Sequence, residues 1–95
     1  MEKLERVKKF IEDNDLDFSG SGSELNGNCV ILAGFICYVI TREPVFTSVD
    51  GWEIINGLKL NEDAHKETYR VFEYAYVNDY EKFWTTEEAK EQYKF

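Results

Sequence analysis

The carboxylates between Asp13 and Glu24 are spaced in a way that could bind a cation. Residues with oxygen-bearing side chains stand at positions 1, 3, 5, 9 and 12 of this segment, as Asp13, Asp15, Asp17, Ser21 and Glu24. Carboxylate and hydroxyl oxygens are the ligands that calcium takes, roughly six to eight at a time. The spacing therefore offers a calcium-binding loop as one interpretation of this segment.

This segment resembles the calcium loop of the EF-hand family, in which 12 residues lie between two helices. The resemblance implies these side-chain ligands: Asp13, Asp15, Asp17 and Glu24. It also implies a carbonyl ligand at Ser19 and a direct or water-mediated contact from Ser21. Phe18 stands where the family has glycine, and Gly20 where it has an aliphatic residue. The match covers about one eighth of the chain and no second loop accompanies it, so a solvated acidic loop is the other interpretation.

A cysteine-dependent enzyme is the next chemistry to consider. Cys29, near the start of an expected helix, could have a lowered thiol pKa, and His65 could serve as its base. However, Cys29 and Cys37 both lie in an apolar run, where cysteine acts as a small hydrophobe. His65 falls in the first turn of an amphipathic helix, where exposure to solvent is usual. We therefore expect no catalytic residue and no cofactor other than the calcium of the alternative interpretation.

The run from Cys29 to Ile40 has no charged residue, although 32% of the chain is charged. Its 12 residues fall short of the roughly 18 to 20 that span a bilayer, so we expect a buried core element. Steps of four and three favour a helix with a buried stripe and connect Leu25, Cys29, Leu32, Ile36 and Val39. The β-branched residues leave an alternative, in which residues 28–41 form the central strand of a small sheet.

The remaining pattern predicts further helices around this element. A serine and glycine segment, residues 19–23, precedes the central helix, which we expect Ser23 to cap. A short helix is expected to begin with Ser48 or Asp50 as its cap and to end at Gly57. A first helix is expected over residues 2–13. Asn61 is the expected cap of a long helix over residues 62–84, and a capping box begins a final helix over residues 86–93. The sequence therefore predicts a mainly α fold, a single compact domain of residues 1–95 formed by a helical bundle around a buried central helix; an α+β fold is the alternative.

The balance of charge indicates what kind of partner the protein could meet. Nineteen acidic and eleven basic residues give a net charge of −8. Such a charge repels nucleic-acid backbones and anionic lipid and favours encounter with basic surfaces. We expect no direct nucleic-acid or membrane binding, and a basic protein surface as partner, for example that of a nucleic-acid-binding enzyme. Unpaired cysteines and a polar N-terminus favour a cytoplasmic location, and the oligomeric state is a monomer or a small homo-oligomer.

Aromatic residues in the C-terminal third suggest where the partner would bind. Tyr74 and Trp84 lie off the inward stripe of the expected long helix, and such rings within a charged rim are typical of interface hot spots. The expected partner-binding residues are Glu73, Tyr74, Glu81, Trp84, Glu87 and Glu88. We therefore expect a small acidic protein-binding module. In general character, its size and charge are similar to those of phage inhibitors such as anti-CRISPR proteins and DNA mimics, and to those of acidic immunity proteins.

Overall fold

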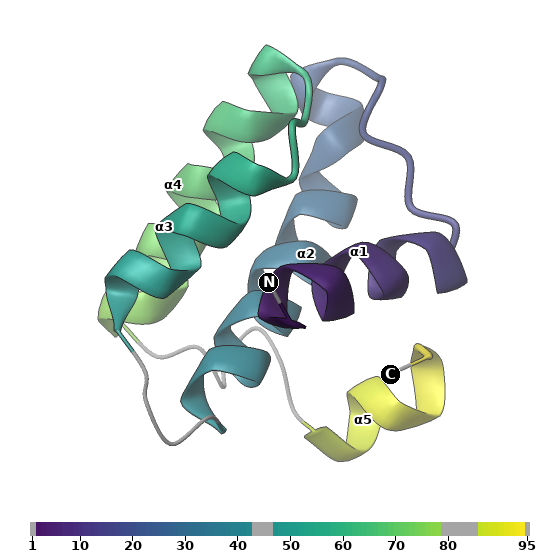
Figure 1. Cartoon of the computed structure of the whole chain (residues 1–95). Helices are drawn as coiled ribbons and strands as arrows, with labels where there is room; N and C mark the ends of the chain where they lie inside the picture. The colour runs from purple at the N-terminus through teal and green to yellow at the C-terminus, as the bar shows by residue number, and fades with distance from the viewer. Residues whose placement is uncertain (1, 43–46, 79–85, 95) are drawn as a thin grey trace.

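The computed structural model describes residues 2–42, 47–78 and 86–94 (Figure 1). Within these ranges the chain forms helices only: α1 (Glu2–Asp13), α2 (Gly22–Thr41), α3 (Ser48–Gly57), α4 (Glu62–Asn78) and α5 (Thr86–Gln92). The prediction of a mainly α bundle is confirmed. The alternative, with residues 28–41 as a central strand, is wrong, because all of them belong to α2.

Helix α2 is the core of the bundle, and α1, α3 and α4 all contact it. Every residue from Leu32 to Cys37 is buried, as are Val39 and Ile40. Neighbouring helices therefore surround most of the circumference of this part of α2. The β-branched residues that favoured a strand gain as much buried apolar surface in this helix as they would in a sheet, because partners surround them on several sides.

The beginning of α2 differs from the prediction. Its N-cap is Ser21 rather than Ser23, and the backbone N–H of Ser21 donates to the Glu24 carboxylate at 2.9 Å. Residues 26–28 belong to α2, although glycine and asparagine weaken a helix. Asn26 and Gly27 are exposed to solvent. The helix that contains the apolar run is therefore 20 residues long.

This length bears on the question of a membrane. The window Glu24–Thr41 is long and apolar enough to cross a bilayer by length and composition alone. However, 56% of that window is buried inside the bundle, as in the core helix of a soluble protein. Burial therefore supports the prediction of a core helix. Length does not, because α2 has 20 residues rather than the 12 of its apolar run.

The other helices begin close to the predicted positions. Thr47 caps α3, and its hydroxyl accepts from the N–H of Asp50 at 3.3 Å, so the expected caps Ser48 and Asp50 are wrong. The side-chain oxygen of Asn61 accepts from the N–H of Ala64 at 2.8 Å, which confirms Asn61 as the cap of α4. Helix α4 is described as far as Asn78, and the rest of the expected 62–84 helix lies outside the described residues.

Helix α4 packs against the small residues of α2. The hydroxyl of Thr68 donates to the sulfur of Cys29 at 3.4 Å, and the carbonyl of Ala64 lies 3.9 Å from that sulfur. The seam formed by Cys29, Ala33 and Cys37 is buried, and Cys29 makes these contacts to α4. The close approach leaves one side of α4 directed away from α2, and this side carries the candidate site.

Candidate functional site

The outward side of α4 exposes two apolar side chains near its C-terminal end. The exposed fraction is 52% for Tyr74 and 71% for Val77, and the acidic Glu73 beside them is exposed as well. The inward stripe of α4 explains this, because its buried residues fall at helical spacing: Ala64, Thr68, Val71, Phe72 and Ala75. Tyr74 lies off this stripe, as the sequence predicts, and Tyr76 is exposed as well.

Two shallow hollows flank Tyr74. One has a volume of about 330 Å³ and is lined by Arg70, Glu73, Tyr74 and Val77. The other has a volume of about 190 Å³, and Val30 of α2 and Val71 line it together with Arg70 and Tyr74. Tyr74 therefore lines two depressions that could receive side chains of a partner. We call the surface formed by Val30, Arg70, Glu73, Tyr74 and Val77 the Tyr74 surface.

Charge on the Tyr74 surface is dominated by Glu73. Arg70 is paired with Glu67 one turn earlier in α4, and its Nε donates to Glu67 Oε2 at 3.2 Å. This hydrogen bond lowers the pKa of the Glu67 carboxyl and raises the pKa of the Arg70 guanidinium. Among the described residues, no cation lies within ion-pair distance of Glu73. The surface therefore combines apolar groups with one carboxylate that no neighbouring cation balances.

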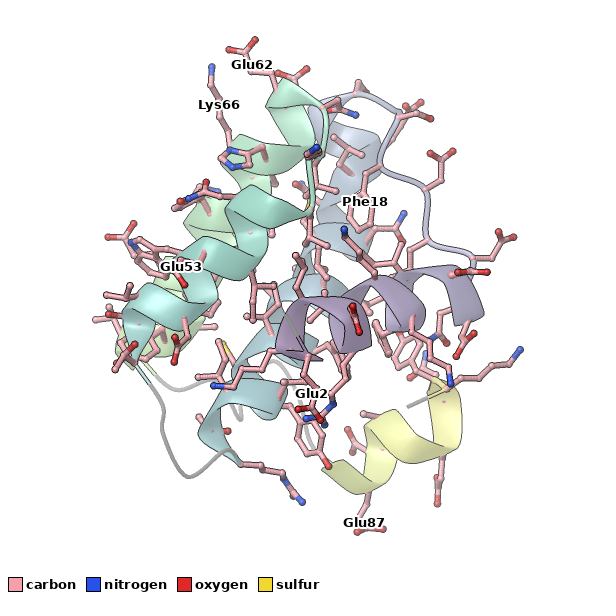
Figure 2. All side chains as sticks on the ribbon, viewed as in Figure 1. Glu2, Phe18, Glu53, Glu62, Lys66 and Glu87 are labelled. Carbon is pink, nitrogen blue, oxygen red and sulfur yellow. The ribbon has the colours of Figure 1, made fainter. Side chains whose placement is uncertain are left out.

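The predicted partner-binding residues are distributed over separate elements. Glu73 and Tyr74 lie on α4, whereas Glu87 and Glu88 are exposed on α5, and Figure 2 shows Glu87 directed outward. Figure 1 draws α5 at the lower right and the C-terminal end of α4 at the left. Glu81 and Trp84 lie outside the described residues. In the described part of the chain, Glu73 and Tyr74 therefore share a surface of α4 that does not include Glu87 and Glu88 of α5.

Arg70 and Val77 belong to this surface, and our reading of the sequence did not include them. The signal was available, because positions 70, 73, 74 and 77 share one face of a helix through steps of three and four. Val77 is more exposed than Tyr74, although valine, unlike tyrosine and tryptophan, is not typical of hot spots.

The structure does not gather the carboxylates of the expected calcium loop around one ion. Asp17 accepts hydrogen bonds from the hydroxyl of Ser19 at 2.6 Å and from its N–H at 2.9 Å, and these bonds lower the pKa of the Asp17 carboxyl. Glu24 is engaged in the cap of α2. In the three described ranges, no group of three His, Cys, Asp or Glu side chains is placed to hold a metal ion, and Asp13 and Asp15 are both exposed.

Phe18 explains why this loop differs from the family it resembles. Its side chain is 8% exposed and points into the bundle (Figure 2), so the position that needs glycine in the family serves as an apolar anchor here. The carbonyl of Phe18 accepts from the side-chain amide of Asn61, and the carbonyl of Asp17 accepts from the amide of Asn28 at 2.7 Å. The loop is therefore held against α2 by Asn28 and against the start of α4 by Asn61.

Neither cysteine is placed for nucleophilic catalysis. Burial raises the pKa of the Cys29 thiol, and it raises the pKa of Cys37 to about 12, so both thiols stay protonated at neutral pH. Cys29 lies inside α2 rather than near its start, because the helix begins at Gly22. The Nε2 of His65 lies 3.1 Å from the side-chain oxygen of Asn56. Cys29 therefore packs between α2 and α4, Cys37 is buried in α2, and His65 of α4 contacts Asn56 of α3.

Comparison with protein-family models finds no match, and neither the curated proteins nor the solved structures contain a significant match to this chain. Function must therefore be argued from the surface and charge of the molecule.

Proposed function

We propose that the protein is a small acidic protein-binding module whose Tyr74 surface binds a basic surface of a partner protein. The observation that carries this proposal is the exposure of Tyr74 and Val77 beside Glu73, together with two hollows that Tyr74 lines. Tyrosine supplies a large contact area at little entropic cost, and hot spots pair such rings with pockets. Contact with a partner would remove this apolar surface from water.

The net charge of −8 supports the choice of a basic partner. The ion pairs Lys3–Asp50, Lys66–Glu62 and Arg70–Glu67 each cancel one positive and one negative charge, so they leave this net charge unchanged. The long-range field that a partner meets is therefore strongly negative, and it would speed association with a positive surface. Inhibitors that occupy the nucleic-acid site of an enzyme, and acidic immunity proteins, act in this way. We place the module in the cytoplasm, where the unpaired, buried Cys29 and Cys37 would stay reduced.

The test begins with capture of the partner from the native host and continues with binding kinetics on the purified pair. Tyr74→Ala should raise the dissociation rate by about tenfold or more, because it removes the proposed anchor. Glu73→Lys should slow association, and the effect should shrink as salt screens the attraction.

Two matched controls test whether an effect is specific to the Tyr74 surface or follows from the same kind of substitution anywhere on the protein. Glu53→Lys makes the same charge change as Glu73→Lys at an exposed position of α3, and Val49→Ala truncates an exposed apolar side chain of α3, as Tyr74→Ala does on α4. We expect the α3 variants to bind like the original protein. The proposal fails if the α3 and α4 variants lose affinity equally, if neither set changes it, or if the captured partner is a nucleic acid.

A further inference from the structure

A cavity of about 370 Å³ lies where α1, α2 and the C-terminal residues meet. Three cationic side chains line it, Arg6 and Lys9 from α1 and Lys94 after α5, and among the described residues of its lining Asp13 is the only acidic one. This is a local excess of positive charge in a chain whose net charge is −8. In the described part of the chain, no carboxylate lies within ion-pair distance of Lys9 or Lys94. Two ammonium groups at the cavity are therefore available to an anion.

The C-terminal part of this cavity is held in place by Asn14, at the end of α1. The side-chain amide of Asn14 donates to the carbonyl of Lys94 at 3.0 Å, and the N–H of Lys94 donates to the side-chain oxygen of Asn14 at 3.0 Å. The ring of Tyr93 also contacts that of Phe10, with centroids 6.3 Å apart. These contacts join residues 80 positions apart in the sequence and fix the backbone that carries the Lys94 side chain.

The inner wall of the cavity is aromatic. The rings of Phe10 and Phe35 are stacked with centroids 4.0 Å apart and an angle of 6° between their planes. Both side chains are almost completely buried, so they give the cavity a rigid apolar floor of small exposed area. Tyr38 completes the wall, and the guanidinium of Arg42 lies 4.3 Å from the centroid of its ring. An apolar wall with a cationic mouth suits a ligand that is flat and apolar at one end and acidic at the other.

We propose that this cavity binds a small organic anion, an aromatic acid whose ring lies against Phe10, Phe35 and Tyr38. The acid group, a carboxylate or a phosphate, would lie between the cationic side chains of Arg6, Lys9 and Lys94. The volume falls within the range of roughly 300 to 1,000 Å³ that is usual for small-molecule sites. This site does not depend on the Tyr74 surface, since the two share no lining residue.

The proposal is tested with three naphthalene probes titrated into the full chain at low salt: 1-naphthoate, 1-naphthyl phosphate and the neutral 1-naphthalenemethanol. We expect both anions to bind, and the alcohol to bind about tenfold more weakly or worse because it lacks a charge for the cations. Tighter binding of the phosphate would assign phosphate monoesters as the ligand class, and tighter binding of the carboxylate would assign carboxylates.

Neighbouring lysines of α1 provide a matched control. Lys9→Gln should weaken both anionic probes about threefold to tenfold, whereas Lys8→Gln makes the same charge change at an exposed position that does not line the cavity. Lys94→Gln should act like Lys9→Gln. Because all three positions are exposed, the variants should fold as the original chain does. The proposal is overturned if the alcohol binds as well as the anions, if Lys8→Gln and Lys9→Gln weaken binding equally, or if no probe binds at millimolar concentration.

Discussion

Replacing Gly51 of α3 by alanine tests how closely α3 approaches its neighbours. A β-carbon at this position would lie 2.2 Å from Cζ of Phe72 and 3.0 Å from Cδ1 of Ile40. The ring of Phe72 is completely buried and packs against Trp52, with ring centroids 4.6 Å apart. The ring therefore has little room to move, and α3 would have to shift away from α4.

The size of the effect follows from two opposing terms. Alanine is favoured over glycine in a helix by roughly 0.5 to 1 kcal/mol. An extra methyl group forced into a packed core costs about 1 to 3 kcal/mol, and the short contact with Phe72 places Gly51 at the upper end of that range. We expect Gly51→Ala to lower the free energy of unfolding by about 1 to 2 kcal/mol.

Gly27 of α2 provides the matched control. A β-carbon there would meet no atom within 4 Å, and the residue is exposed, so only the helix term remains. Gly27→Ala should raise the free energy of unfolding by roughly 0.5 to 1 kcal/mol. The same chemical change should thus have opposite signs at two positions, with a difference of about 2 to 3 kcal/mol.

Urea denaturation followed by far-ultraviolet circular dichroism measures both variants. The expected loss for Gly51→Ala corresponds to a fall in melting temperature of roughly 5 to 15 °C. An unchanged slope of the free energy of unfolding against urea concentration would show that the folded state is preserved. If Gly51→Ala were as stabilising as Gly27→Ala, α3 would not pack against Phe72 as described, and the reasoning about this contact would be refuted.

Two further predictions concern titratable groups. Because burial raises the pKa of Cys37 from its ordinary value of 9.0 to about 12, the folded state retains that proton longer than the unfolded chain, and stability should fall between pH 9.0 and about 12. The Cys37 thiol contributes at most about 1.4 kcal/mol per pH unit to this fall in the free energy of unfolding. The free energy of unfolding of Cys37→Ala should therefore fall less steeply over that interval, and parallel pH profiles for the two proteins would contradict the assignment. Calorimetric titration with millimolar calcium should give no binding heat and no rise in melting temperature, since Asp17 and Glu24 accept hydrogen bonds from their own loop. A stabilisation that is lost in Glu24→Gln would contradict that expectation.

The helices could be predicted from the sequence because their signals are local. The stripe from Leu25 to Val39 predicts α2, and Asn61 predicts the beginning of α4. The start of α2 was misplaced because Ser21 and Ser23 are both good caps by residue type. The spacing of Ser21 and Glu24 decides between them, since a glutamate three residues after a serine can return a hydrogen bond to the backbone N–H of that serine.

The two surfaces differ in how much of them the sequence contains. The exposure of Tyr74 follows from its position off the buried stripe of one helix, so its periodicity alone indicates it. The cationic cavity combines Lys9 with Lys94, and a pair of hydrogen bonds between Asn14 and Lys94, 80 positions apart, holds the two lysines at the same cavity. No local sequence pattern predicts that Lys9 and Lys94 meet. The basic residues of α1 alternate with glutamates, which is typical of a solvated helix face. Only the fold separates these lysines from those glutamates. It directs Lys9 to the cavity and leaves Glu5 and Glu12 outside its lining, so that a chain with an excess of acid can still offer an anion a positive site.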